Sequence, residues 1–324
     1  MDPKLRDQNL QTLGTGVAQR LDDAATGTGI FFERQLEHVQ EEVLREKMPP
    51  LSAFTILPID RSVPPHARTY TCRMLKSHGV AKFISNYSRD LPRVGVDAEE
   101  TTFNCRDIGV SYGYPITDIE AARATGVPLD PEMARTARMS TEELQNETAW
   151  FGNDAVGLYG VTNFPQFPRL LITTAFDETS TPDEILSAMH TIGNGIHLRT
   201  KGAAGSSKTG VMCMPLTALE YVANTARSST SDTTILEYFL RTNRYISRVE
   251  AVHELDEAGP NSEPMIFCFD PGGGALAMVL PLMFTQYPAQ NVGLEVNIPC
   301  RAKSGGIKSM RPLEVTLAVI PKAA

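Results

Sequence analysis

A long polar segment between two strand-like segments is the feature that most constrains this chain. The strand-like alternation of apolar and polar residues is carried by Tyr70, Cys72 and Met74 before the segment and by Val110, Tyr112 and Tyr114 after it. Alternation with a period of two is typical of strands with one buried face. The residues between are too many for a tight hairpin turn. They indicate either a functional excursion, held by another molecule, or a floppy surface insertion.

The N-terminal region has the character of an arm. Its first thirty residues are polar, with pairs of Gly and Thr, and could not bury a core by themselves. Residues 31–47 then carry apolar side chains at helical spacing with charges elsewhere, and Pro49 and Pro50 end the pattern. The apolar positions are Phe32, Leu36, Val39 and Val43. This amphipathic helix needs a partner surface.

A long helix is predicted over residues 130–151. Asp130 suits the N-cap, Pro131 the first helical position, and Gly152 the end of the helix. The predicted apolar stripe is sparse and consists of Met133, Ala137, Leu144 and Phe151. We therefore expect the helix to lie across a surface along one narrow contact line.

The second half of the chain predicts mixed α/β structure. Thr181 and Glu184 form a capping box at the start of a helix over 181–195, which we expect Gly193 and Gly195 to end. Further helices are predicted over 215–226 and 232–243. Strands are predicted over 211–214, 265–269, 275–282, 294–298 and 313–320. We expect a tight hairpin at Pro271–Gly274, and one buried face in the last strand, formed by its alternating apolar residues.

The segment KGAAGSSKTG, Lys201–Gly210, is close to a phosphate-binding loop. That motif needs Gly directly before its Lys, and here Ser207 precedes Lys208. The motif also needs a strand before it and a helix after it, and the predicted order is the reverse. The pattern favours a solvated loop. A nucleotide-binding enzyme that uses Lys208 and Thr209 is the alternative from another functional class.

No catalytic pattern occurs elsewhere in the chain. There is no GxSxG, the six histidines show no HExxH spacing, and the five cysteines contain no CxxC. His190 and His197 are nearly two helical turns apart, but they lack further ligands. The cysteines are expected to be small core residues in a reducing compartment. We predict no enzyme, and no catalytic, cofactor-binding or metal-binding residues.

Composition and charge exclude other classes. Hydrophobic residues are 42% and charged residues 21%, which is typical of globular proteins. The net charge of −8 argues against a surface built throughout to coat nucleic acid. Neither a signal peptide nor a stretch long enough to span a membrane is present, so we expect a soluble protein made and kept in the cytoplasm.

Several stretches taken in order resemble one branch of a known family. They are FFERQLEHVQEEVLREKMPPLSAFTILPID, YSRDLPRVGVDAEE, YPITDIEAARATGVPLDPEMARTA and GLEVNIPCRAKSGGIKSMRPLEV. As an ordered set they resemble the major capsid proteins of tailed bacteriophages, which have the Hong Kong 97-like fold. The resemblance covers nearly everything after residue 30.

The resemblance implies an α+β fold with four parts. Residues 1–65 would form the N-terminal arm with its amphipathic helix, and 66–112 the extended E-loop that lies over the adjacent subunit. Residues 113–174 and 291–324 would form the peripheral domain with its long spine helix. Residues 175–290 would form the mixed α/β axial domain, which packs around five-fold and six-fold axes.

The resemblance also implies a function. The chain would self-assemble as pentamers and hexamers into an icosahedral phage head enclosing double-stranded DNA, which it would contact non-specifically. It would be a virion protein assembled in the cytoplasm of the host bacterium, without cofactor or membrane. Scaffolding, portal and cement proteins are further candidate partners. The near alternative is an encapsulin-type compartment shell protein.

Eight residues are candidates for contacts between subunits. In the loop, the cations Lys76, Lys82, Arg89 and Arg93 could meet acids of a neighbour; in the arm, the candidates are Phe32, Leu36, Val39 and Val43. Some members of the family cross-link loop lysines to asparagines, but no matching pattern is found here, so we do not expect cross-links. No long charged helical segment precedes the arm, so we expect any scaffold to be a separate protein.

Overall fold

The computed structural model describes residues 48–83, 91–125, 132–204, 207–228 and 230–322. The chain divides into two units, Met1–Pro50 and Leu51–Ala324. All helices and strands described below belong to the second unit. The amphipathic helix predicted over 31–47 lies outside the described residues.

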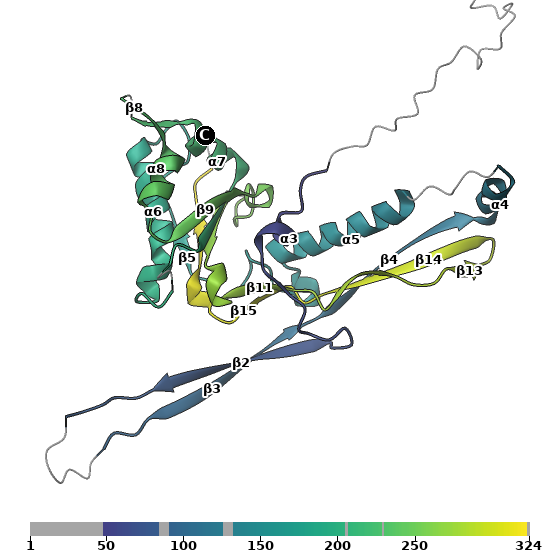
Figure 1. The fold of residues 1–324 in the computed structure, drawn as a ribbon, viewed down its shortest axis with the longest axis horizontal. Helices are drawn as coiled ribbons and strands as arrows, with labels where there is room; N and C mark the ends of the chain where they lie inside the picture. The colour runs from purple at the N-terminus through teal and green to yellow at the C-terminus, as the bar shows by residue number, and fades with distance from the viewer. Residues whose placement is uncertain (1–47, 84–90, 126–131, 205–206, 229, 323–324) are drawn as a thin grey trace, which may run out of the picture. The chain divides into compact units, whose positions relative to one another are not determined.

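A five-stranded mixed sheet forms the centre of the second unit (Figure 1). Its inner strands are antiparallel neighbours, and each edge strand runs parallel to the strand beside it. In spatial order the strands are β5 (Arg169–Leu171), β16 (Val315–Val319), β10 (Met265–Phe269), β6 (Gly210–Met214) and β9 (Ile246–Ala251). The predicted strands over 211–214 and 265–269 are therefore confirmed.

The two faces of this sheet belong to two different hydrophobic clusters. Val211, Phe267 and Leu317 point into one cluster. Their chain neighbours Met212, Ile266 and Ala318 point into the other. Because side chains alternate between the faces of a strand, the middle strands β6, β10 and β16 are buried on both sides.

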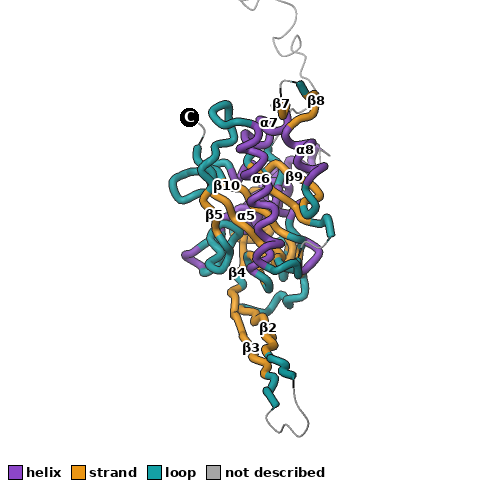
Figure 2. The backbone as a smooth tube through the Cα atoms, turned by 90° about the vertical axis from the view of Figure 1, so that its left-hand side faces the viewer, coloured by secondary structure: helices purple, strands orange, loops and turns teal. Residues whose placement is uncertain are grey.

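Three helices cover the face of the sheet that belongs to the second cluster, and Figure 2 shows them close together. They are α6 (Pro182–Arg199), α7 (Leu216–Asn224) and α8 (Ile235–Thr242). The predicted capping box at the start of α6 is confirmed. The Glu184 backbone N–H donates to Thr181 Oγ1 at 3.4 Å, and the Thr181 N–H donates to Glu184 Oε2 at 2.9 Å.

The predicted end of α6 is wrong, because the helix passes through Gly193 and Gly195 and continues to Arg199. A Cβ atom at Gly193 would lie 3.1 Å from Ile246 Cγ1, which is tighter than ordinary packing. The missing side chain thus allows β9 to approach the helix closely. Close packing keeps glycine in the helix here, although its helical propensity is low.

A polar cluster joins the other face of the sheet to two helices, α3 (Ser52–Ile56) and α5 (Glu132–Phe151). Trp150 Nε1 donates to Ser52 Oγ at 2.8 Å, and Ser52 Oγ donates to Glu254 Oε1 at 2.7 Å. Asn146 Nδ2 donates to the same carboxylate oxygen. The Trp150 ring meets Phe267 of β10 edge-on, with ring centroids 6.0 Å apart. Hydrogen bonds therefore fix how α5 lies over the sheet.

The predicted apolar stripe of α5 is mostly wrong. Met133, Leu144 and Phe151 are 47%, 41% and 37% exposed, and only Ala137 of the stripe is buried. The buried line instead consists of Ala137, Thr141, Gln145, Asn146, Thr148, Ala149 and Trp150.

The two threonines can line this contact because carbonyls of the helix itself accept from their hydroxyls. Thr141 Oγ1 donates to the Ala137 carbonyl at 2.8 Å, and Thr148 Oγ1 donates to the Leu144 carbonyl at 2.7 Å. Gly152 ends α5 as predicted, with a φ of 72° that favours glycine.

Four smaller sheets complete the described part of the unit, and one of them consists of β2 (Thr69–His78) and β3 (Gly95–Asn104). A four-stranded sheet contains β12 (Leu282–Gln286), β14 (Glu295–Ser304), β13 (Gln290–Val292) and β4 (Arg106–Pro115), with α5 lying along it (Figure 1). Helix α4 (Ile116–Thr125) follows β4. A three-stranded sheet contains β1 (Ile59–Asp60), β11 (Leu276–Val279) and β15 (Ile307–Ser309), and β7 (Ala226–Ser228) pairs with β8 (Ser231–Thr234).

The hairpin predicted at Pro271–Gly274 is wrong. The strand before it, β10, lies in the five-stranded sheet, and the strand after it, β11, lies in the three-stranded sheet. Pro271–Gly273 forms a short 3-10 turn, in which Asp270 Oδ1 accepts from the Gly272 N–H at 2.9 Å. The turn therefore carries the chain from one sheet to another.

The prediction of one buried face for the last strand is also wrong. Thr316 and Ala318 are completely buried, like the apolar residues between them. Leu313 is 53% exposed and lies in a 3-10 turn, Pro312–Glu314, before the strand. Both faces of β16 are covered because a separate cluster lies on each side of it.

We expect Phe267→Ala to lower the free energy of unfolding by about 3–5 kcal/mol, because the ring is fully buried between Trp150 and Phe269. Urea denaturation of the unassembled chain measures this. Leu171→Ala serves as the control, since Leu171 is 85% exposed, and should change the value by no more than about 0.5 kcal/mol. Equal effects of the two substitutions would contradict the assignment of the core.

The ion pair between Asp60 and Lys308 should make stability depend on pH. Asp60 Oδ2 lies 2.5 Å from Lys308 Nζ. Burial raises the pKa of Asp60. The hydrogen bonds from Lys308 and Ser62 lower it by more than burial raises it, so the pKa lies below its ordinary value of 3.8. The ionised carboxylate therefore stabilises the fold above about pH 4, and this contribution is lost as the pH falls below that value.

Asp60→Asn should accordingly destabilise the chain near neutral pH, and the difference from the wild type should shrink at about pH 3. Denaturation curves recorded at several pH values test this. A difference that stays constant over the whole range would show that Asp60 does not act through its charge.

Candidate inter-subunit interface

A two-stranded hairpin projects from the rest of the second unit (Figure 2). Its strands are β2 (Thr69–His78) and β3 (Gly95–Asn104), which pair antiparallel over ten residues each. Among the described strands, neither pairs with any other. A two-stranded hairpin is only marginally stable in water. It therefore depends on contacts outside its own ladder.

The base of the hairpin is anchored in the core. The Tyr70 ring stacks on Phe103 with centroids 5.3 Å apart, and Phe103 is 5% exposed. The Tyr70 hydroxyl donates to the Gly305 carbonyl at 3.3 Å. Burial raises the pKa of Tyr70, so the phenol stays neutral and keeps its donor. The predicted inward face of Tyr70, Cys72 and Met74 is confirmed by their half-buried positions.

The outer part of the hairpin exposes large apolar side chains. They are Leu75, Val80, Phe83, Leu91, Val94 and Val96, all at least 59% exposed. Leu75 pairs with Ala98 and Val96 with Ser77, so Leu75 and Val96 lie on the same face of the ladder. A concentration of exposed apolar groups on a projecting segment marks a contact surface for another chain.

Oppositely charged side chains, and one histidine with a carboxylate, lie close together across the two described strands of the hairpin. Arg73 Nε lies 2.7 Å from Glu100 Oε1, Lys76 pairs with Glu99, and His78 Nδ1 lies 3.5 Å from Asp97 Oδ2. All these side chains are at least half exposed, so each pair contributes no more than about 1 kcal/mol. Lys76 thus has an acidic partner in its own chain, and its contact with an acid of a neighbour stays a prediction.

The structure places the other predicted contact residues only in part. Lys82 and Arg93 are exposed on the two arms of the same hairpin. Arg89, Phe32, Leu36, Val39 and Val43 lie outside the described residues. The pattern in the sequence did not single out the exposed apolar residues. Leu75 could have been noticed, because it falls opposite the alternating residues at 70, 72 and 74.

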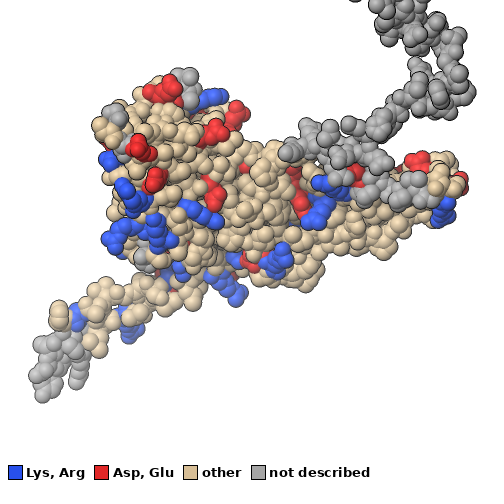
Figure 3. All heavy atoms as spheres, turned by 45° about the horizontal axis from the view of Figure 1, so that its top comes forward, with Lys and Arg blue, Asp and Glu red and all other residues tan. Residues whose placement is uncertain are grey.

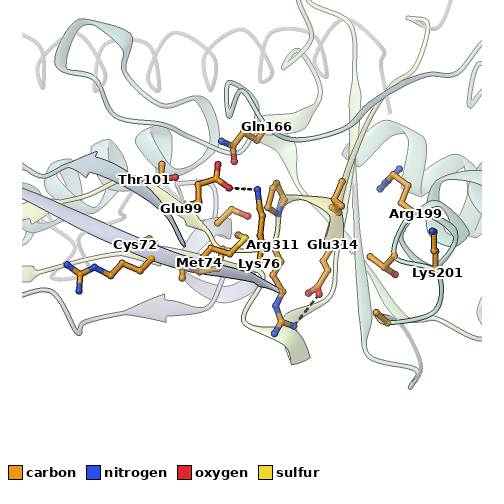
Figure 4. A pocket seen from close by; sticks show the side chains of 17 residues that line it. Cys72, Met74, Lys76, Glu99, Thr101, Gln166, Arg199, Lys201, Arg311 and Glu314 are labelled. Atoms are coloured by element: carbon orange, nitrogen blue, oxygen red, sulfur yellow. Dashed lines mark hydrogen bonds and ion pairs between the residues drawn. The ribbon is translucent and has the colours of Figure 1, made fainter. Parts of the chain in front are cut away.

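A groove lies between the base of the hairpin and the body of the unit, shown in Figure 4. We call it the hairpin groove; its volume is about 580 Å³. It is lined by Cys72, Arg73, Met74, Lys76, Glu99 and Thr101 of the hairpin, and by Gln166, residues 199–201, Ala203 and residues 309–314 of the body. These segments are far apart in the sequence, so no local pattern could predict the groove.

The loop Lys201–Gly210 is not arranged for nucleotide binding. It follows helix α6 and precedes strand β6, as predicted. Lys208 Nζ donates to the Leu240 carbonyl, and Thr209 Oγ1 donates to Asp270 Oδ1 at 2.8 Å. Both side chains that would bind phosphate are therefore engaged by the protein itself, and the geometry does not favour the enzyme alternative.

The histidines and cysteines occupy ordinary structural positions. His197 stacks on Tyr245 with centroids 4.3 Å apart, and burial lowers the pKa of His190, which lies beside Phe239. Four of the five cysteines are buried and all are free. Within the described ranges, no three His, Cys, Asp or Glu side chains gather as metal ligands would. The same ranges contain no helix with the length and apolar character that crossing a membrane requires.

A folded body with a projecting apolar hairpin defines a subunit that contacts other chains. Comparison with protein families is consistent with this class. The model of the major capsid protein family matches residues 79–318. The chain therefore belongs to the major capsid protein family.

Solved structures show the same fold. The capsid protein of Myoviridae phage XM1 is 13% identical, with a TM-score of 0.77 over 90% of this chain and 99% of that one. The capsid protein of cyanophage P-SCSP1u is 10% identical, with a TM-score of 0.60 over 89% and 93%. A virus-like particle protein from Pyrococcus furiosus is 11% identical, with a TM-score of 0.53 over 82% and 91%. A search of curated proteins finds no significant match. The predicted α+β capsid fold is confirmed.

Amide hydrogen exchange should divide the hairpin into two halves. In the unassembled chain, residues 75–78 and 95–98 should exchange faster than residues 69–72 and 101–104, because only the base is packed on the core. Mass spectrometry of peptides from the exchanged protein measures this. Equal protection along both strands would show that the outer half is held by contacts within the chain.

Proposed function

We propose that this chain assembles as pentamers and hexamers into an icosahedral phage head that encloses double-stranded DNA. Membership of the major capsid protein family supports the role in a capsid. The projecting hairpin, with its exposed apolar outer half, is the observation that carries the proposal for assembly. Burial of these side chains against a neighbour would remove apolar area from water without enlarging the core of the subunit.

We propose which residues form the four parts that the resemblance implies. The hairpin β2–β3 would be the E-loop, 66–112, lying over an adjacent subunit, and residues 1–65 the N-terminal arm. Residues 175–290, with α6, α7 and α8, would be the axial domain. Residues 113–174 and 291–324, with α5 as the spine helix, would be the peripheral domain. The central sheet spans these boundaries, since β16 of the proposed peripheral range pairs with β10 of the proposed axial range.

The proposed partners follow from this role. The first partner is a second copy of the chain, through contacts between different surfaces of each copy, which can close into rings. Scaffolding, portal and cement proteins and non-specifically contacted DNA are further proposed partners. The protein would be located in the virion after assembly in the cytoplasm of the host, and would need neither a cofactor nor catalytic residues.

A compartment shell that encloses protein cargo is the second candidate function. The similarity to the virus-like particle protein from Pyrococcus furiosus favours it, although with a lower TM-score than the phage XM1 capsid protein. The content of purified particles separates the two functions: DNA supports the phage head, and co-purified protein cargo supports the compartment.

Sedimentation of the full chain, with imaging of the heaviest fraction, tests self-assembly directly. Closed shells or capsomers are expected, and a stable monomer would contradict the proposal. The variant Leu75→Glu with Val96→Glu should reduce assembled material by on the order of tenfold, because burying two new carboxylates is costly. The free energy of unfolding of the unassembled variant should differ from that of the wild type by no more than about 0.5 kcal/mol, since both sites are exposed. If the variant assembles as well as the wild type, the outer half of the hairpin does not form part of the interface.

A further inference from the structure

One face of α5 exposes polar and apolar side chains along the helix and two carboxylates in its C-terminal half. At 100° per residue, one sector of the helix carries Met133, Thr136, Ser140, Glu143, Leu144, Glu147 and Phe151. We call this face the acidic ridge. All seven residues are exposed, and no Lys or Arg shares the sector. The ridge lies away from the line by which α5 packs on its own unit.

Among the described residues, no cation balances the charges of the acidic ridge. Glu143 and Glu147 are one helical turn apart, where like charges repel and destabilise a helix. Within the described part of the chain, neither forms an ion pair. Glu142, on another side of α5, differs in this respect because Arg138 Nε lies 2.7 Å from its carboxylate. A cationic surface placed against the ridge would relieve the repulsion.

The hairpin groove has the opposite charge. Five cationic side chains line it, against two carboxylates, Glu99 and Glu314. Both carboxylates are already engaged, Glu99 by Lys76 and Glu314 by Arg311 at 3.3 Å. The groove therefore has an excess of positive charge that its own acids do not neutralise.

Two of the cations have no carboxylate partner among the described residues. Arg199 Nη2 donates to the Val315 carbonyl at 2.9 Å and to the Thr316 hydroxyl, which are neutral acceptors. Lys201 is exposed, and among the described residues its side chain has no partner. Figure 4 shows both on the body side of the groove, opposite Met74 and Cys72 on the hairpin side. The cations Arg199 and Lys201 thus lie across the groove from two apolar side chains of the hairpin.

The acidic ridge and the hairpin groove carry charges of opposite sign on different parts of the molecule. Figure 3 shows that basic and acidic side chains are unevenly distributed over the visible face of the protein. Groups of opposite sign that lie on separate surfaces of one chain attract each other across an interface between copies. Electrostatic complementarity therefore offers the acidic ridge a partner on a second copy.

We propose that the hairpin groove of one copy receives the acidic ridge of α5 from a second copy. Glu143 and Glu147 would approach Lys201 and Arg199, while Leu144 and Phe151 would cover Met74 and the exposed side chain of Leu313. This inference rests on the proposed self-assembly and names the surfaces that meet. An α-helix is roughly 10–12 Å across, so the ridge side chains, and not the whole helix, fill a groove of about 580 Å³.

The contact must form between copies. Within its own unit, α5 is held by α3 and the central sheet through Trp150 and Asn146, so its ridge cannot enter the groove of the same chain. Groove and ridge are different surfaces, and every copy carries both. Such a heterologous contact repeats from copy to copy and can close into a ring.

Charge reversal tests the proposal. Glu143→Lys with Glu147→Lys should reduce sedimenting particles by on the order of tenfold, and Lys201→Glu alone should also reduce them. The triple variant that combines all three changes should recover part of the loss. The matched control joins the ridge variant to Arg241→Glu, an exposed cation on α8 that does not line the groove, and should recover nothing. Equal recovery with both, or recovery with neither, would overturn the proposal.

Proximity can be measured with the native cysteine of the groove. Cys72 is half-buried and the other four cysteines are buried. With Leu144→Cys, a bismaleimide reagent should therefore link the introduced thiol of one copy to Cys72 of the next, producing dimers and longer species on denaturing gels. Adding Cys72→Ser should abolish them, and Leu171→Cys, at another exposed leucine, should not produce them.

The outcomes separate this docking from self-assembly itself. Particles that sediment as the wild type does, without links that depend on Cys72, would overturn the docking and leave the shell function standing. Links confined to single chains would also overturn it. Absence of particles from the wild-type chain, together with absence of links from the Leu144→Cys chain, would overturn both proposals. Unfolding curves of each unassembled variant exclude loss of folding as the cause.

Discussion

Burial of the central sheet on both faces is the constraint on which the rest of the structure depends. The strands β6, β10 and β16 place large apolar side chains on each side, so each side needs its own covering layer. Helices α6, α7 and α8 provide one layer. The other comes from α3, α5 and the small sheet around β11, where the hydrogen bonds among Ser52, Trp150 and Glu254 set the position of α5. Two layers are enough to hold the fold, and segments outside them are available for contacts with other chains.

The hairpin is one such segment. Its base shares the core through Phe103, while its outer half has only its own ladder and exposed ion pairs. These pairs contribute too little to hold an extended ribbon in place. A subunit with this shape gains stability when neighbours cover the ribbon. Membership of the major capsid protein family and the similarity to capsid structures agree with that physical reading.

The distribution of charge over the subunit also favours contacts between copies. The net charge of −8 limits adhesion to nucleic acid over the whole surface, yet the groove at the base of the hairpin has an excess of cations. The acidic ridge of α5 carries carboxylates that form no ion pair with the described residues of its own chain. Two such surfaces on one subunit favour head-to-tail contacts between copies over contacts of a surface with itself, because like surfaces repel. The hairpin groove is thus better understood as an interface than as a site for a small ligand.

The sequence by itself determined the local elements. Thr181 with Glu184 began a helix, Gly152 ended one, and the alternation at Tyr70, Cys72 and Met74 marked the inward face of a strand, because caps and periods act over a few residues. Only the tertiary structure decided which faces are buried. It buried polar Thr141 and Gln145 on α5 and exposed Leu144, let α6 continue past Gly195, and covered both sides of β16. The walls of the hairpin groove likewise come from segments at opposite ends of the described chain. Burial is set by neighbours that are distant in the chain, and a local pattern does not contain them.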